Sequence, residues 1–94
     1  MTIQFSEEAK LDYKEAYQWY SEIDKYLAER FESELDDVLK RLSDSSSQFP
    51  KVTELTQRAL FGKFPYSLFF IKTDSRIIIT AILHHRRNPA RWKV

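Results

Sequence analysis

Cysteine is absent from this 94-residue sequence, and Gly62 is its only glycine. Without cysteine the chain has neither a disulfide framework nor thiolate ligands for a metal. A single glycine excludes the glycine-rich loops that hold nucleotide phosphates and the nucleophile elbow of hydrolases. The only histidines, His84 and His85, are adjacent on a predicted strand, where neighbouring side chains point to opposite faces. We therefore expect no metal site and no cofactor.

Long hydrophobic runs are also missing. No apolar stretch approaches the roughly 20 residues of a membrane span. The N-terminus, MTIQFSEEAK, lacks the basic and apolar regions of a signal peptide. Hydrophobic residues make up 43% and charged residues 31%, a balance typical of globular proteins. We expect a cytoplasmic protein without membrane contacts, in which residues 1–94 form a single domain.

Charge is divided unevenly along the chain. Residues 1–47 carry twelve acidic and six basic side chains, whereas residues 48–94 carry two acidic and nine basic ones. The net charges of the two halves are therefore −6 and +7, which gives the overall +1. Such an asymmetry suggests that the C-terminal half meets an anionic partner. Alternatively, the two halves simply attract each other across the fold.

The first half of the sequence predicts one strand and two helices. Residues 2–5 form the expected strand, and Ser6 is a suitable N-cap for a helix with an apolar face up to Ile23. Asp24 can cap the second helix, 28–42, which the serine-rich run 43–47 ends. Because the link between them is so short, we expect the helices to form an antiparallel α-hairpin.

In the second half of the sequence, the pattern of residues is typical of β-strands instead of helices. Residues 58–61, 66–71 and 77–84 are rich in aromatic and branched side chains and are separated by turn sequences. The last of these segments has apolar residues on both faces, so we expect it to be a central strand. The predicted fold class is α+β, in the order β-α-α-β-β-β, with a helical hairpin packed on a small antiparallel sheet.

The densest group of chemically active side chains follows the last strand, where residues 84–92 read HHRRNPARW. Guanidinium groups bind phosphates and carboxylates bidentately, and arginine and tryptophan are enriched where proteins grip a partner. Two further cationic side chains, those of Arg58 and Lys63, lie on or beside neighbouring predicted strands. They can lie on the same face of the sheet as the arginines that follow the last strand. The predicted target-binding residues are Arg58, Lys63, Arg86, Arg87, Arg91 and Trp92.

Other interpretations of these residues stay open. Trp92 can instead cover the edge of the core, since tryptophan is mostly buried, and His84 can simply bond to the backbone at a strand end. A general acid–base ribonuclease would use a histidine that titrates near neutrality and cations that bind the scissile phosphate. The candidate residues for such an enzyme are Arg58, His84, His85 and Arg87.

The C-terminal half resembles the RelE/ParE toxins of bacterial type II toxin–antitoxin systems. The resemblance rests on Arg58, on the stretch FPYSLFF at 64–70, on the strand IIITAILHH at 77–85, and on the pattern H-x-R-x-P-x-x-W at 85–92. The N-terminal strand, the aromatic helix with Trp19 and the second helix agree with that family's layout. The resemblance thus covers nearly the whole chain.

This resemblance implies one of two activities. RelE-like members cleave messenger RNA in the ribosome, whereas ParE-like members inhibit DNA gyrase without being enzymes. Cleaving members carry a basic residue where this chain has Pro65 and Tyr66. Their other catalytic groups are only partly replaced here, by Lys51, by Glu54, and by His84 or His85. We therefore favour a ParE-like, non-enzymatic inhibitor of DNA gyrase. The alternatives are a ribosome-dependent messenger RNA endonuclease, with the ribosome and its message as partners, and a non-toxic antitoxin-binding module.

The resemblance also implies a protein partner, a cognate antitoxin whose disordered C-terminal segment folds on the toxin in a hetero-oligomer. Fourteen aromatic residues in so short a chain agree with this, because a small core cannot hide them all.

Overall fold

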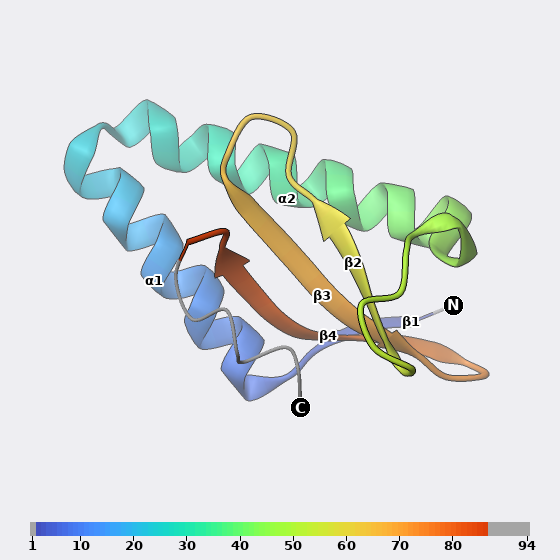
Figure 1. Cartoon of the computed structure of the whole chain (residues 1–94). Coiled ribbons are helices and arrows are strands. Elements are labelled where there is room, and N and C mark those ends of the chain that lie inside the picture. The colour runs from blue at the N-terminus through green and yellow to red at the C-terminus, as the bar shows by residue number, and fades with distance from the viewer. Residues whose placement is uncertain (1, 87–94) are drawn as a thin grey trace.

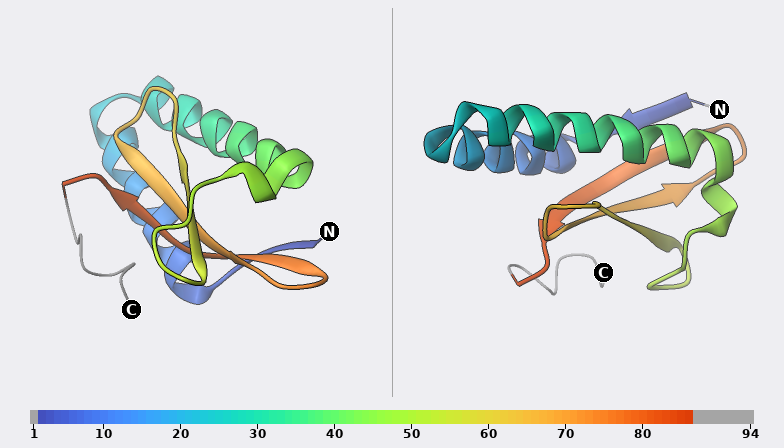
Figure 2. Two further views of the ribbon diagram at one scale, coloured as in Figure 1. Left: turned by 45° about the vertical axis from the view of Figure 1, so that its right-hand side comes forward. Right: turned by 90° about the horizontal axis from the view of Figure 1, so that it is seen from above.

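The computed structural model describes residues 2–86 and confirms the order β-α-α-β-β-β. Two helices lie on one face of a four-stranded sheet (Figures 1 and 2). The elements are β1 (Thr2–Phe5), α1 (Glu7–Ile23), α2 (Lys25–Ser45), the short 3-10 helix η1 (Ser46–Gln48), β2 (Thr56–Leu60), β3 (Tyr66–Lys72) and β4 (Arg76–His84). No helix within these residues is long and apolar enough to cross a membrane.

The two helices begin and end at the polar residues that the sequence indicates. The Ser6 hydroxyl accepts a hydrogen bond from the Ala9 N–H at 3.1 Å and so caps α1. Asp24 ends α1 and begins α2, because its N–H donates to the Tyr20 carbonyl and its carboxylate accepts the Tyr26 N–H, both at 2.9 Å. One residue thus provides both caps, which makes the connection as short as predicted.

Helix α2 extends beyond the predicted range 28–42 at both ends. It continues through most of the serine-rich run to Ser45 and then tightens into η1. Serine has only a moderate preference against helices, so the run does not stop the helix by itself. The chain leaves helical structure just before Pro50, a residue that disfavours helix in the position preceding it.

The sheet has the strand order β1-β4-β3-β2, so β4 is central, as predicted. Strand β3 is antiparallel to both β2 and β4. Strand β1, however, pairs with β4 in parallel, so the sheet is mixed and the expected all-antiparallel sheet is wrong for this pair. Hairpin turns fix the direction only of strands that follow each other, and β1 and β4 lie at opposite ends of the chain.

A β-bulge divides β4 into two halves with different side-chain alternation. The register shifts between Phe69 and Phe70, which pair with Ala81 and Ile79, so Thr80 is the extra residue. Because of this insertion Ile79 and Ile82 both face the helices, where they are almost completely buried. Every side chain of β4 after Thr80 therefore faces the side opposite to the one that simple alternation predicts.

The main core lies between the helices and the sheet and is rich in aromatic rings. At its centre Phe31 of α2 is fully buried. Phe31 contacts the rings of Tyr13, Tyr20, Phe61, Phe64 and Tyr66 at centroid distances of 5.0 to 5.9 Å. A smaller cluster on the other face of the sheet consists of Phe69, Ala81 and Leu83, with Val52 packed against it.

Candidate functional site

Two of the predicted target-binding residues, Lys63 and Arg86, lie at the same end of the sheet. Strand β3 begins where β4 ends, and the His85 N–H donates to the Pro65 carbonyl at 2.8 Å. This bond ties the segment after β4 to the turn that carries Lys63. Arg86 is exposed there, and its N–H donates to Nδ1 of His84 at 3.1 Å. The structure thus brings two of the predicted cations to one rim.

The turn that carries Lys63 is fixed by a carboxylate from α2. Both oxygens of Glu34 accept the Lys63 backbone N–H at 2.9 Å. The Cβ of any residue in place of Gly62 would come within ordinary contact of the same carboxylate, at 3.6 Å. Helix α2 therefore holds the turn in place through its backbone, and the Lys63 side chain is exposed.

Arg58 lies on the face of the sheet that the helices do not cover. It is on β2 opposite Phe69 of β3, whereas the next residue, Ala59, belongs to the core beneath the helices. The Nε atom of Arg58 is buried and has no hydrogen-bond partner. Buried polar atoms without partners are rare and costly in native proteins.

His84 lies on the opposite face from Arg58. It pairs with Tyr66, and the two rings meet edge to face at 5.3 Å on the side of the helices. The bulge at Thr80 determines this placement, because uninterrupted alternation from Ile79 would put His84 on the uncovered face. The sheet therefore separates the imidazole of His84 from the guanidinium of Arg58. The two residues therefore do not lie on the same face of the sheet.

The remaining candidate residues fall into two groups. His85 follows β4 and is exposed. Arg87, Arg91 and Trp92 lie outside the residues that the structure describes. The alternative in which Trp92 covers the edge of the core therefore stays a prediction. Within residues 2–86, no group of three or more histidine, aspartate or glutamate side chains is placed to hold a metal ion.

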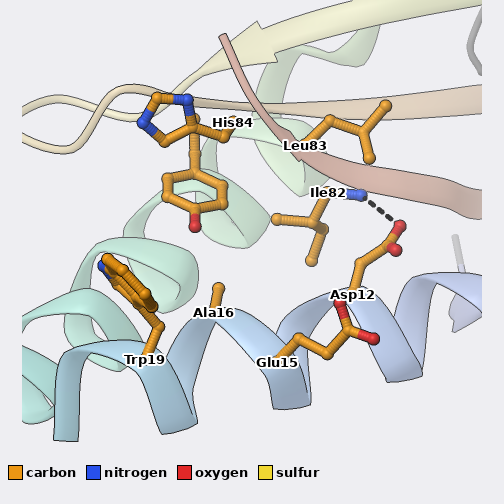
Figure 3. Close-up of a pocket in the computed structure, with 8 residues that line it drawn as sticks. Asp12, Glu15, Ala16, Trp19, Ile82, Leu83 and His84 are labelled. Atoms are coloured by element: carbon orange, nitrogen blue, oxygen red, sulfur yellow. Dashed lines mark hydrogen bonds between the residues drawn. The ribbon is translucent and has the colours of Figure 1, made fainter. Parts of the chain in front are cut away.

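A groove that the sequence analysis missed lies between α1 and the end of β4 (Figure 3). We call it the α1–β4 groove, and its cavity measures about 240 Å³. It is lined by Asp12, Glu15, Ala16, Trp19, Tyr66, Ile82, Leu83 and His84. Its lining comes from α1, from the start of β3 and from the end of β4, segments that no local sequence pattern connects. The only signal was that Asp12, Glu15 and Trp19 recur at helical spacing beside the apolar face of α1.

Two side chains, one from the N-cap of α1 and one from α1 itself, bond to the edge of β4. Strand β1 ends at Phe5, opposite Ile79, so it does not reach the second half of β4. Beyond that point the Ser6 hydroxyl donates to the Thr80 carbonyl at 3.4 Å. Oδ2 of Asp12 accepts the Ile82 N–H at 3.0 Å, as the dashed line in Figure 3 marks. Polar side chains thus replace the missing strand.

Comparison with known proteins agrees with this architecture. The family described as the ParE toxin of type II toxin–antitoxin systems, parDE, matches residues 3–89. A solved structure of the chromosomal ParDE toxin–antitoxin system from P. aeruginosa is similar, with a TM-score of 0.77. The two sequences are 18% identical, and the match covers 89% of this chain and 95% of that one, so it shows a shared fold.

No protein with a curated description matches the sequence. The family match nevertheless spans almost the entire chain, and the solved structure shares its arrangement of helices and strands. The chain therefore belongs to the ParE family of toxins from type II toxin–antitoxin systems.

Proposed function

We propose that this ParE-type toxin acts by binding and inhibiting DNA gyrase, without chemistry of its own. In the same proposal, a cognate antitoxin neutralises it in a cytoplasmic hetero-oligomer. The observation that carries the proposal is the placement of Arg58 and His84 on opposite faces of the sheet. Acid–base cleavage of RNA needs a proton-transfer group and a cation at the same phosphate. Because Arg58 and His84 lie on opposite faces, their arrangement favours binding of a partner over acid–base catalysis.

The surface proposed to meet the target is the cationic side of the sheet. Lys63 and Arg86 are exposed at one rim, and Arg58 lies on the face that the helices leave uncovered. Arg87, Arg91 and Trp92 complete the set proposed from the sequence. Guanidinium groups favour anionic partners, and charges at the rim of an interface accelerate association with such partners.

The test is to induce the protein in bacterial cells and to assay the purified chain. Inhibition of gyrase predicts that DNA replication stops first, that a DNA-damage response follows, and that DNA supercoiling by purified gyrase decreases. An early stop of translation with cuts in ribosome-bound messages would overturn the proposal in favour of the endonuclease. If neither effect occurs, the chain is a non-toxic binding module.

A single substitution tests the proposed surface. Arg86→Ala is expected to weaken inhibition of supercoiling about tenfold or more and to leave folding unchanged, because the side chain is exposed. Arg76→Ala is the matched control, since Arg76 is an exposed arginine at the first residue of β4, at the opposite end of that strand from Arg86. Equal inhibition by the two variants would exclude Arg86 from the target-binding surface. A loss of circular dichroism in Arg86→Ala would instead mean that the residue is structural.

A further inference from the structure

We propose that Glu34 of α2 is a positioning residue for binding of the target, because its carboxylate fixes the turn that presents Lys63. This inference rests on the proposed function, in which Lys63 and Arg86 meet the target at one rim of the sheet. Glu34 acts through the backbone of the turn and not through contact with the target.

The turn between β2 and β3, residues 61–65, lies next to α2 and is anchored to it by aromatic packing (Figure 1). Phe61 and Phe64 are 5% and 8% exposed, and both rings contact Phe31 of α2. The Phe61 N–H donates to the Tyr66 carbonyl at 3.0 Å, and the Tyr66 N–H donates to the Phe64 carbonyl at 2.8 Å. Packing and these two bonds therefore fix both ends of the turn.

The tip of the turn, between these anchors, is held by Glu34. Gly62 and Lys63 are exposed, and both carboxylate oxygens of Glu34 accept the Lys63 N–H at 2.9 Å. Among the described residues, no other hydrogen bond reaches Gly62 or Lys63. A charged acceptor makes such a bond stronger than one between neutral groups. The position of Lys63 therefore depends on this carboxylate.

The charge of Glu34 and its position have opposite effects on binding. The carboxylate bonds to the backbone of Lys63, whose ammonium group forms no ion pair with any described residue. A carboxylate beside a cationic rim weakens the attraction of an anionic partner. If only charge matters, removal of Glu34 should strengthen inhibition of the target. If Glu34 positions Lys63, its removal should weaken inhibition.

The second cation of the rim depends less on Glu34. The Pro65 carbonyl accepts the His85 N–H at 2.8 Å, and Arg86 is the next residue. Pro65 directly follows the buried ring of Phe64, so the aromatic anchor holds this carbonyl in place. We therefore expect Glu34 to position Lys63 and to have little effect on Arg86.

Two substitutions of Glu34 separate position from charge in the full-length protein. Glu34→Asp keeps the charge but withdraws the carboxylate from the Lys63 N–H by one methylene group. It should speed hydrogen exchange of the Lys63 amide and weaken inhibition of purified gyrase, each about fivefold, the usual effect of losing one hydrogen bond. Glu34→Gln removes the charge but keeps an oxygen acceptor, so it should retain the slow exchange and most of the inhibition.

The matched control is Glu29→Asp, the same substitution at an exposed glutamate of α2 whose carboxylate bonds to no described residue. It should change neither the exchange of the Lys63 amide nor the inhibition of gyrase. An equal effect of Glu29→Asp and Glu34→Asp would overturn the inference, as would unchanged exchange of the Lys63 amide in Glu34→Asp. A loss of circular dichroism in Glu34→Asp would also overturn it, because Glu34 would then be needed for folding.

A double variant tests whether Glu34 acts through the Lys63 side chain. Lys63→Ala keeps the backbone N–H but removes the ammonium group, so it should weaken inhibition by itself. In that background Glu34→Asp should cause no further loss, because the side chain that it positions is gone. Additive losses would mean that Glu34 affects binding by another route and would overturn the inference.

Failure of this inference is distinct from failure of the proposed function. If the unmodified protein leaves gyrase active, the proposed function fails, and exchange of the Lys63 amide still shows whether Glu34 holds the turn. If the unmodified protein inhibits gyrase but Glu34→Asp behaves like its control, only the role of Glu34 is wrong.

Discussion

Phe31 contributes more to the core than any other aromatic residue of α2, because it is fully buried and contacts five other rings. Phe31→Ala should lower the free energy of unfolding by about 3 to 5 kcal/mol, since it removes these contacts and leaves a cavity. Urea unfolding would measure the loss. The control is Leu55→Ala at a side chain that is 75% exposed, where a change within about 0.5 kcal/mol is expected. A similar, small loss in both variants would show that the aromatic cluster is not the centre of stability.

Tyr13 is a residue whose ionisation is coupled to folding. Burial, and then the nearby Glu32 carboxylate that accepts its hydroxyl at 3.3 Å, raise the pKa of Tyr13 well above its ordinary value. Above pH 10, roughly the pKa of an unperturbed tyrosine, the unfolded chain loses this proton while the folded chain keeps it. The unfolded state then binds fewer protons, so stability should fall as the pH rises.

Thermal unfolding between pH 8 and pH 11 tests this coupling. Tyr13→Phe should reduce the alkaline loss of stability, because it removes the group that must stay protonated. Tyr26→Phe is the matched control at a tyrosine that is 73% exposed, and it should keep the full pH dependence. The same slope in both variants would contradict the assignment to Tyr13.

At the scale of elements, the second half of β4 depends on α1 for its outer edge. Asp12→Ala should cost about 1.5 to 3 kcal/mol of stability, since it removes a charged acceptor from the Ile82 N–H. Asp12→Asn keeps a carbonyl acceptor in the same place and should cost less. Hydrogen exchange of the Ile82 amide provides the local measurement, with clearly faster exchange expected in Asp12→Ala. Unchanged protection there would mean that the hydrogen bond does not stabilise the strand edge.

For the whole molecule, the exposed apolar side chains of the helical hairpin affect the solubility of the protein in the absence of its antitoxin. Trp19, Ile23 and Tyr26 are between 52% and 73% exposed. We expect the isolated protein to be poorly soluble, because exposed apolar side chains favour association. Coexpression with the antitoxin from the adjacent reading frame should give a monodisperse complex in size-exclusion chromatography. A highly soluble, monodisperse and non-toxic chain would contradict this expectation.

Local sequence patterns predicted the elements well but not the relations between them. The caps at Ser6 and Asp24 and the central position of β4 followed from residue types and spacing. The parallel pairing of β1 did not, because its partner lies more than 70 residues away. The bulge at Thr80 could not be predicted either. A strand with apolar residues on both faces gives no indication of where the alternation of its side chains changes.

The sequence by itself determined the α+β class, the order of the elements and the family resemblance, because capping, periodicity and turn residues act over a few neighbouring positions. Only the tertiary structure decided which side chains meet. One extra residue in β4 moved His84 to the helix side, away from Arg58, and the crossing of α1 over β4 brought Asp12, Glu15 and Trp19 to a groove. Both results depend on pairing and packing between distant segments, which are settled by the shape of the whole core.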